Sequence, residues 1–286
     1  MTININDIKL LRDRTGAGIS DCKKALEECN GNIERASDKL RVIGLAKAGR
    51  KSDRVVSEGL IAMHLSENYG VLIELNCETD FVAKNERFMG LALKLASLAC
   101  KERFTKIDEL QNAKYEETST VNEVILNESS VLGEKLQLSK FDYATATNGI
   151  IAGYVHGSTS STGKIGALVV LESHGDKIKL QEIGKQVAMH IVAMKPEALS
   201  IDDLGQDKLN NKRSLILEEV KNLNKPEEVT KKIIDGRMAK YYEEVVLLEQ
   251  KFIKDDKLSV CDFLKSSLNV PVELSSYRLL ALSNDN

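Results

Sequence analysis

The sequence predicts an α+β fold made of a small helical bundle, a duplicated core of antiparallel hairpins and helices, and an inserted helical hairpin. Three observations support it. Glycines divide the start of the chain into short helical segments, a strand–strand–helix pattern occurs twice, and two polar helices interrupt the second half. The expected parts are residues 1–54 (bundle and linker), 55–140 (first core half), 141–202 with 258–286 (second core half), and 203–257 (arm).

The bundle is predicted from the signals that start and stop helices. Residues with short polar side chains cap helix beginnings, and glycine ends helices because it accepts a left-handed backbone. The expected caps are Asn4 or Asn6, Ser20 and Asn32, and the expected stops are Gly16 with Gly18, Gly31 and Gly44. Three short helices follow from this pattern. The basic residues 47–54 after them read as a solvated linker.

The core is predicted from an internal repeat. Residues 60–65 resemble residues 150–155 at a shift of 90 positions, and a glycine precedes each copy. Further along, the shift becomes 96, because the second copy has a longer turn over residues 157–163, which is rich in glycine, serine and threonine. Each copy reads as a β-hairpin followed by a helix. The two halves of the core are therefore expected to share one architecture.

Residues 79–82, Thr-Asp-Phe-Val, lie where the second strand of the first copy gives way to a helix. An aromatic residue at such a boundary either packs inward or projects outward to contact a partner. Phe88, seven residues after Phe81, favours the inward interpretation, because large apolar side chains are mostly buried. The repeat favours the outward one, since Lys177 aligns with Phe81 and a core position rarely accepts lysine. Both interpretations stay open.

Composition limits the classes of partner. Charged residues make up 29% of the 286 residues and the net charge is −3, so no global basic field attracts nucleic acid or an anionic membrane. No apolar run approaches the roughly 20 residues that a membrane span needs. The amino terminus has the features of neither a signal peptide nor a transit peptide. We expect a cytoplasmic protein that contacts neither nucleic acid nor membrane directly.

No motif predicts a metal or a cofactor. The five cysteines lack a Cys-x-x-Cys pair and read as reduced, buried residues, and the four histidines are scattered without ligand spacing. Residues 157–165 superficially resemble a phosphate-binding loop. However, five residues separate Gly157 from Gly163 instead of four, and Ile165 stands where the loop requires a hydroxyl for magnesium. We expect a turn here, and no enzyme activity.

Two tracts are specific enough to indicate a family. Residues 12–26, which contain Arg-Asp-Arg-Thr-Gly-Ala-Gly-Ile-Ser-Asp, and residues 79–85, Thr-Asp-Phe-Val-Ala-Lys-Asn, resemble the two signatures of the elongation factor Ts family. The tracts occur in the right order, about sixty residues apart. Further agreement comes from residues 187–190 and 236–238. The resemblance covers most of the chain.

The resemblance implies a function. Members of this family are guanine nucleotide exchange factors for elongation factor Tu, the GTPase that carries aminoacyl-tRNA to the ribosome, and they do no covalent chemistry. The amino-terminal bundle is then a ubiquitin-associated-like module that contacts the GTPase domain. The residues carried over are Arg12, Ile19 and Lys23 for the GTPase domain, Thr79, Asp80, Phe81 and Val82 beside the magnesium and switch region, and His156 for the third domain of the partner.

Several alternatives remain at this point. The arm over residues 203–257 resembles the family's protruding antiparallel coiled coil, but its short apolar stripes also suit a helix pair packed on the core. The sequence leaves open a homodimer, or a heterotetramer with the partner. The main rival function is a structural or ubiquitin-like interaction protein, which uses the bundle to dock peptides and the duplicated sheet to self-associate.

Overall fold

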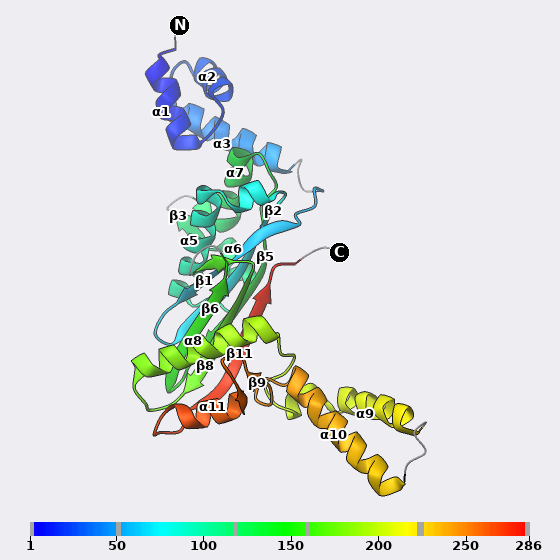
Figure 1. The fold of residues 1–286 in the computed structure, drawn as a ribbon. Coiled ribbons are helices and arrows are strands. Elements are labelled where there is room, and N and C mark those ends of the chain that lie inside the picture. Colours follow the sequence, from blue (N-terminus) through cyan, green and yellow to red (C-terminus); the bar gives the residue numbers. More distant parts are fainter. Residues whose placement is uncertain (1–2, 50–52, 117–118, 158–160, 222–225, 284–286) are drawn as a thin grey trace.

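The computed structural model describes residues 3–49, 53–116, 119–157, 161–221 and 226–283, with the backbone alone for residues 44–49. The bundle lies at one end of an elongated molecule, the core lies in the middle, and the arm projects from the other end (Figure 1). Helices and antiparallel strands occur in separate layers and segments, which confirms the α+β class.

The amino-terminal bundle consists of α1 (Ile5–Thr15), α2 (Ile19–Glu28) and α3 (Ile33–Gly49). The Asn4 side chain accepts a hydrogen bond from the Asn6 N–H at 3.0 Å, and the Asn32 side chain accepts one from the Arg35 N–H at 3.0 Å, so both cap as expected. The three helices enclose a small core of their own, formed by Leu11, Cys22, Ala25, Leu26, Ala36 and Leu40.

Two predictions for the bundle are wrong. The cap of α2 is Gly18, without a side-chain hydrogen bond, and Ser20 already lies inside the helix. The third helix continues through Gly44 to Gly49, so residues 47–49 of the expected linker are helical. A glycine inside a helix costs only about 1 kcal/mol relative to alanine, and good helix formers follow this one. Residues 50–52 of the linker lie outside the described part of the chain.

The two hairpins of the core are β1 (Glu58–Leu65) with β2 (Tyr69–Cys77), and β6 (Gly149–His156) with β8 (Ile165–Glu172). Leu60 pairs with Leu75 in the first hairpin, and Ile150 pairs with Leu171 in the second. These partners differ by shifts of 90 and 96 positions, as the sequence repeat predicts. The helices that follow are α5 (Glu86–Glu102) and α8 (Lys177–Met194).

The core has four layers, helix–sheet–sheet–helix (Figure 1). The strand order is β5-β2-β1-β7 in one sheet and β11-β8-β6 in the other, where the added strands are β5 (Gln137–Thr145), β7 (Thr162–Gly163) and β11 (Glu273–Ala281). Alternate side chains point to opposite faces. Leu60 therefore packs toward α5, while its neighbour Ile61 packs toward Ile151 and Leu168 of the other sheet.

The region over residues 104–140 covers one side of the first sheet and carries the bundle. It contains α6 (Ile107–Asn112), the short strands β3 (Lys114–Glu116) and β4 (Ser119–Thr120), and α7 (Val121–Leu132), against which α3 packs. Strand β5 then crosses the expected boundary between residues 140 and 141 and pairs with β2 of the first sheet. The first half of the core therefore takes in residues that the sequence assigned to the second.

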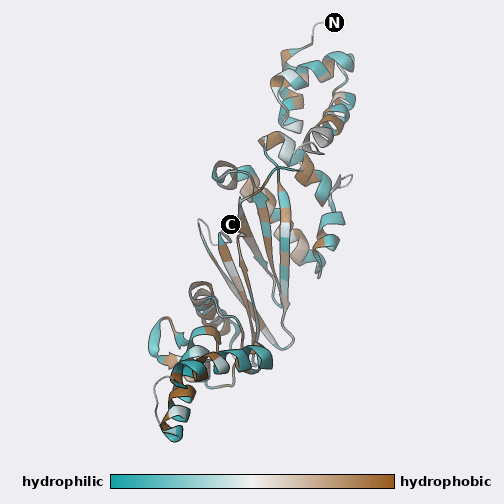
Figure 2. Ribbon diagram, turned by 90° about the vertical axis from the view of Figure 1, so that its right-hand side faces the viewer, coloured by the Kyte–Doolittle hydropathy of each residue, from teal (hydrophilic) through white to brown (hydrophobic). Residues whose placement is uncertain are grey.

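The arm consists of α9 (Gln206–Lys221) and α10 (Glu227–Val245), preceded by the 3-10 turn η1 (Asp202–Leu204). Hydrophilic residues predominate along both helices (Figure 2). The buried apolar residues extend from the base of the arm into the seam between its two helices; they are Ala198, Leu204, Ile216, Val220, Met238, Tyr241 and Val246. The arm therefore projects and does not lie flat on the core (Figure 1).

After the arm, the chain returns to the second half of the core. It passes through β9 (Lys251–Phe252), β10 (Asp255–Ser259) and α11 (Val260–Ser267) before β11. Phe252 is buried in the same cluster as the α8 side chains, although the sequence assigned it to the arm. This return segment anchors the base of the arm to α8.

Candidate partner-binding site

Residues 80–83 form the four-residue helix α4 (Asp80–Ala83), which directly follows the end of β2. Thr79 caps it, with its hydroxyl oxygen accepting from the Val82 N–H at 3.5 Å. Phe81 is 81% exposed, whereas Phe88 is completely buried in the core of the first half. The ring of Phe81 therefore does not belong to the face that Phe88 continues, and it projects outward.

The two sides of α4 have different surroundings. Val82 is half-buried and Ala83 is buried, and both pack on the core of the first half. Asp80 faces solvent beside Phe81 and forms an ion pair with Lys84, with Oδ2 and Nζ 2.7 Å apart. The hydrogen bond from Lys84 is the main cause that lowers the pKa of Asp80. The exposed side of α4 thus combines an apolar ring with an ionised carboxylate.

His156 lies at the end of β6 and is exposed. Its Nδ1 lies 3.0 Å from the hydroxyl oxygen of Tyr154, two residues earlier on the same face of the strand. The carbonyl oxygen of His156 accepts a hydrogen bond from the Lys164 N–H at 3.1 Å, which closes the turn. Of the expected turn, residues 158–160 lie outside the described residues.

Gly157 and Gly163, the two glycines of the segment that resembles a phosphate-binding loop, contact each other across the hairpin. A Cβ built on Gly157 would lie 2.2 Å from the Cα of Gly163, so the two backbones are in direct contact. The two ends of the segment therefore meet, as they do in a hairpin. This contact supports the interpretation of the segment as a turn.

The turn after His156 and the helix α4 lie at the same end of the core. The Lys164 Nζ lies 2.6 Å from Glu58 Oε2 and 3.2 Å from the carbonyl oxygen of Gly59, at the start of β1. Its positive charge also contributes to the lowered pKa of Asp80. The packing of the two halves therefore brings together two candidate contacts, Asp80 and His156, that are 76 residues apart in the sequence.

Arg12, Ile19 and Lys23 are exposed on the bundle, and Ile19 is 58% exposed. Ile19 and Lys23 lie one turn apart on α2, and Arg12 lies on α1. Lys23 also lies 3.9 Å from Glu27 in a solvent-exposed ion pair. These three side chains form a surface separate from α4, so the candidate contacts fall on two parts of the molecule.

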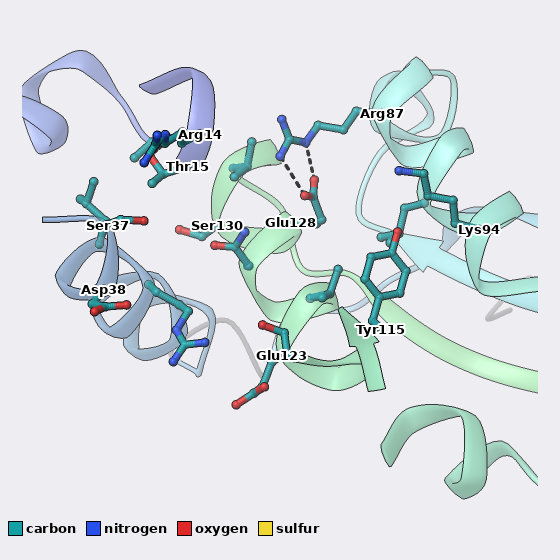
Figure 3. A pocket seen from close by; sticks show the side chains of 18 of the residues that line it. Arg14, Thr15, Ser37, Asp38, Arg87, Lys94, Tyr115, Glu123, Glu128 and Ser130 are labelled. Atoms are coloured by element: carbon teal, nitrogen blue, oxygen red, sulfur yellow. Dashed lines mark hydrogen bonds and ion pairs between the residues drawn. The ribbon is translucent and has the colours of Figure 1, made fainter. Parts of the chain in front are cut away.

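A polar cleft of about 610 Å³ separates the bundle from the first half of the core (Figure 3). Its walls come from α3, α5 and α7, with Arg14 and Thr15 at the end of α1. The Arg87 guanidinium pairs with the Glu128 carboxylate between α5 and α7, at 2.5 and 2.8 Å. The described residues that line it do not include the candidate contact residues of the bundle or of α4. The cleft is thus a boundary between two bodies that carry different contacts.

Comparison with known proteins decides the family. The sequence profile of the family described as "Elongation factor TS" matches residues 78–281. The chain is 69% identical to "Elongation factor Ts" of Wolbachia sp. subsp. Drosophila simulans (strain wRi) and 46% identical to that of Ehrlichia canis (strain Jake), over at least 99% of each chain. The chain belongs to the elongation factor Ts family. The resemblance of the two signatures is therefore confirmed.

The match to the family model begins after the first hairpin and extends over the rest of the first half, the arm and the second half. It includes α4 and His156, whereas the bundle precedes the matched range and is covered by the full-length relatives. Sequence reasoning missed Lys164 and Lys84 at the site. The i, i+4 spacing could have predicted the pairing of Lys84 with Asp80. The pairing of Lys164 with Glu58 joins residues 106 apart, and no local sequence pattern predicts it.

Three further observations concern the part of the chain that the structure describes. No three histidine, cysteine, aspartate or glutamate side chains within it gather closely enough to hold a metal ion. None of its helices combines the length and the apolar character of a membrane span. All five cysteines are free; Cys22, Cys77 and Cys100 are buried, while Cys29 and Cys261 are half-buried, contrary to the expectation that all are buried.

Proposed function

We propose that the protein is a guanine nucleotide exchange factor, which binds elongation factor Tu carrying GDP, disturbs its magnesium and phosphate site, and promotes GDP release during translation elongation. Membership of the elongation factor Ts family supports this proposal. The single observation that carries it is the exposed Phe81 ring next to the ionised Asp80 on α4. Both side chains are accessible to another molecule.

Exchange requires a difference in affinity and no covalent step. A factor that binds the nucleotide-free GTPase more tightly than the nucleotide-bound form weakens nucleotide binding by the same ratio. Phe81 would act as an apolar wedge, because burying an exposed phenylalanine in a partner contributes about 1.5–3 kcal/mol. That free energy can stabilise a displaced element of the GTPase. No cofactor and no enzymatic residue is needed for this mechanism.

The carboxylate of Asp80 would act on the metal region. Magnesium is held by oxygen ligands in near-ideal octahedral geometry, so a displaced element or a competing carboxylate disturbs its site. Without the metal, the charge of the diphosphate is less neutralised and GDP binds more weakly. The i, i+4 pairing with Lys84 lowers the pKa of Asp80 and so favours its ionised form. Thr79 and Val82 hold the two side chains in place from either side.

The remaining candidate residues would provide affinity. In this proposal the bundle is a ubiquitin-associated-like module whose Arg12, Ile19 and Lys23 contact the GTPase domain, and His156 contacts the third domain. The expected parts 1–54, 55–140, 141–202 with 258–286, and 203–257 then serve as module, two core halves and accessory arm. We place the protein in the cytoplasm with elongation factor Tu as its partner, without direct contact to nucleic acid or membrane. A homodimer, or a heterotetramer with that partner, stays open.

The test is the variant Phe81→Ala in stopped-flow release of a fluorescent GDP analogue from elongation factor Tu. We expect stimulated release to slow much more than overall docking weakens, because the rest of the interface is unchanged. Ile178→Ala is the control, since Ile178 is 73% exposed at the second position of α8. Full stimulation by the Phe81 variant would overturn the proposal.

The second candidate function is a protein-interaction module without exchange activity. The exposed apolar side chains of the bundle favour it, since Ile5 is 79% exposed and Val42 is 63% exposed. Co-purification separates the two functions. A stoichiometric GTPase that GDP and magnesium release supports exchange, whereas a partner that nucleotide does not release supports the module.

A further inference from the structure

The helix α4 is too short to be stable by itself. It contains four residues, and helix formation is unfavourable until several consecutive turns have formed. Its own cap is weak, because the Thr79 oxygen accepts from the Val82 N–H at 3.5 Å, the upper limit for a hydrogen bond. The outward position of Phe81 must therefore be fixed by contacts from outside the helix.

These contacts come from the segment after α7. One Glu134 carboxylate oxygen accepts hydrogen bonds from the Glu78 N–H and the Thr79 N–H, both at 3.0 Å, and the other accepts from the Thr79 hydroxyl at 2.5 Å. In return, the Glu78 carboxylate accepts from the Lys135 N–H at 2.6 Å. The two segments are thus joined in both directions, across 56 residues of sequence.

Glu134 is itself held in position. Its carbonyl oxygen accepts a hydrogen bond from the hydroxyl of Ser129 at 2.5 Å, and Ser129 is buried on α7. The Glu78 carboxylate also accepts from the Arg54 guanidinium at 3.1 and 3.3 Å. A rigid helix on one side and the strand β2 on the other therefore fix the residue that leads into α4.

We propose that Glu134 is a positioning residue for exchange, which holds the start of α4 so that Phe81 projects toward the partner. This inference rests on the proposed function of Phe81. A carboxylate suits this place, because two N–H groups and a hydroxyl converge on it and an ionised carboxylate accepts at both oxygens. A glutamine at the same place offers one acceptor oxygen. Its N–H₂ group faces either the two N–H donors or the Thr79 hydroxyl, which would then have to accept instead of donate and would lose its charge-assisted bond. The substitution Glu134→Gln thus loosens α4 with almost no change in shape.

The chain contains a closely matched control. At the start of α6, the Glu109 carboxylate accepts from the Thr105 N–H at 2.7 Å, from the Lys106 N–H at 3.1 Å, and from the Thr105 hydroxyl at 3.4 Å. The donors are again two successive N–H groups and a threonine hydroxyl. Glu109 has no place in the proposed site. At Glu109 a single oxygen, Oε2, accepts all three, whereas Glu134 uses both of its oxygens. Glu109→Gln therefore controls for the loss of a carboxylate at a helix start, without affecting α4.

The experiment compares Glu134→Gln with Glu109→Gln in GDP release from elongation factor Tu, measured over a range of factor concentrations. We expect the maximal stimulated rate to fall about tenfold for Glu134→Gln, the size of effect that losing a hydrogen bond to a charged group gives. The concentration for half-maximal stimulation changes less. Glu109→Gln keeps the wild-type rate. Equal rates for the two variants would overturn the inference.

A double variant and a measurement without the partner complete the test. If Glu134 acts through Phe81, adding Glu134→Gln to Phe81→Ala causes little further loss, whereas additive losses would overturn the inference. Hydrogen exchange of the free protein should show faster exchange at residues 80–84 in Glu134→Gln, and unchanged exchange there would also overturn it. If Glu134→Gln does not fold, Thr79→Val, which removes the hydroxyl donor, is measured in the same way.

The two proposals fail in different ways. Full stimulation by Phe81→Ala would overturn the exchange function of the ring, whatever Glu134 does. A strong effect of Phe81→Ala together with wild-type behaviour of Glu134→Gln would leave that function in place and overturn the role of Glu134.

Discussion

At the scale of single residues, the two halves of the core show why Phe81 is exposed. The sequence repeat aligns Phe81 with Lys177, but the helix starts give a different equivalence. Phe81 is the second residue of α4 and Ile178 is the second residue of α8, and they are 81% and 73% exposed. The break between α4 and α5 adds one residue to the first half. The comparison of Phe81 with Lys177 correctly favoured an exposed ring, but the structural equivalent of Phe81 is Ile178.

The structure explains why glycine precedes the repeated strand segment in both copies. Gly59 and Gly149 lie at the beginning of the first strand of each hairpin, as the second residue of β1 and the first residue of β6, where the partner strand lies unusually close. A Cβ would lie 2.3 Å from the carbonyl oxygen of Leu75 at Gly59, and 1.8 Å from that of Leu171 at Gly149. Because both obstacles are backbone atoms, neither can move aside as a side chain tip would. Both halves of the core therefore contain the same close approach of two strands.

The first stability prediction follows from this close approach. We expect Gly149→Ala to lower the free energy of unfolding by about 1–3 kcal/mol, or more, because the added methyl group forces the strands apart. Urea denaturation measures the change. Gly236→Ala is the control, since among the described residues no atom outside its own stretch of α10 lies within 4 Å of its Cβ position. It should raise the stability by about 0.5–1 kcal/mol. Equal effects of the two variants would contradict the prediction.

At the scale of elements, local signals predicted most helices and strands. The helix α7, for example, begins where Thr120 and Glu123 form a capping box, which is a local pattern of a polar cap and an acid three residues later. The site could be predicted only in part. Phe81 and Asp80 lie in one local signature, whereas Glu134 and Lys164 reach the site through packing between distant segments. Long-range partners of this kind leave no periodic pattern in a single sequence.

The attachment of the arm depends on a buried histidine. His190 on α8 is completely buried, and its Nε2 lies 2.9 Å from Gln250 Oε1. Its Nδ1 accepts from the Ile253 N–H at 3.2 Å, so the pair of contacts suits a neutral ring with the proton on Nε2. Burial is the main cause that lowers the pKa of His190, against the opposite effect of Gln250. The return segment after the arm is thus fixed to α8 by an uncharged imidazole.

This arrangement predicts a dependence of stability on pH. The folded protein disfavours protonated His190, so its stabilising contribution is complete above the pKa of the unfolded chain, about 6.5, and is lost as pH falls from there toward the folded value. We expect the melting temperature of the wild type to fall more steeply below pH 6.5 than that of His190→Gln, which keeps polar contacts without titrating. His64→Gln, exposed on β1, should follow the wild type. Parallel curves for His190→Gln and wild type would refute this.

At the scale of the whole molecule, polar contacts join the two halves of the core beside their shared apolar layer. Arg278 of β11 donates from Nε to Asp142 Oδ1 of β5 at 3.1 Å. The carboxylate of Glu74, buried on β2, lies 3.0 Å from the Lys140 Nζ and accepts from the Ser283 N–H at 2.9 Å. The end of the described chain thus crosses from the second sheet back to the first. These links keep α4 and His156 at one end of a single rigid body.

The bundle is fixed to this body at a glycine of the first signature. Gly16 has a φ of +66°, and its Cβ position lies 2.8 Å from the side chain of Val131 on α7. An alanine there would strain the backbone and collide with α7 at the same time. Gly18 in the same loop lies at an ordinary φ of −61°, and in the described part of the chain no atom beyond its direct neighbours lies within 4 Å of its Cβ position. The first signature therefore serves docking of the bundle on the core as well as the proposed contact with the partner.

The last prediction tests whether the two candidate surfaces act together. We expect Gly16→Ala to shift the bundle relative to the core and to weaken binding of elongation factor Tu several-fold, because Ile19 and Phe81 can no longer contact one partner without strain. Small-angle X-ray scattering should show an altered distribution of distances, and calorimetry should show the lower affinity. Gly18→Ala should leave both unchanged. If Gly16→Ala binds like the wild type despite an altered distribution, the orientation of the bundle does not determine affinity, and the two surfaces act independently.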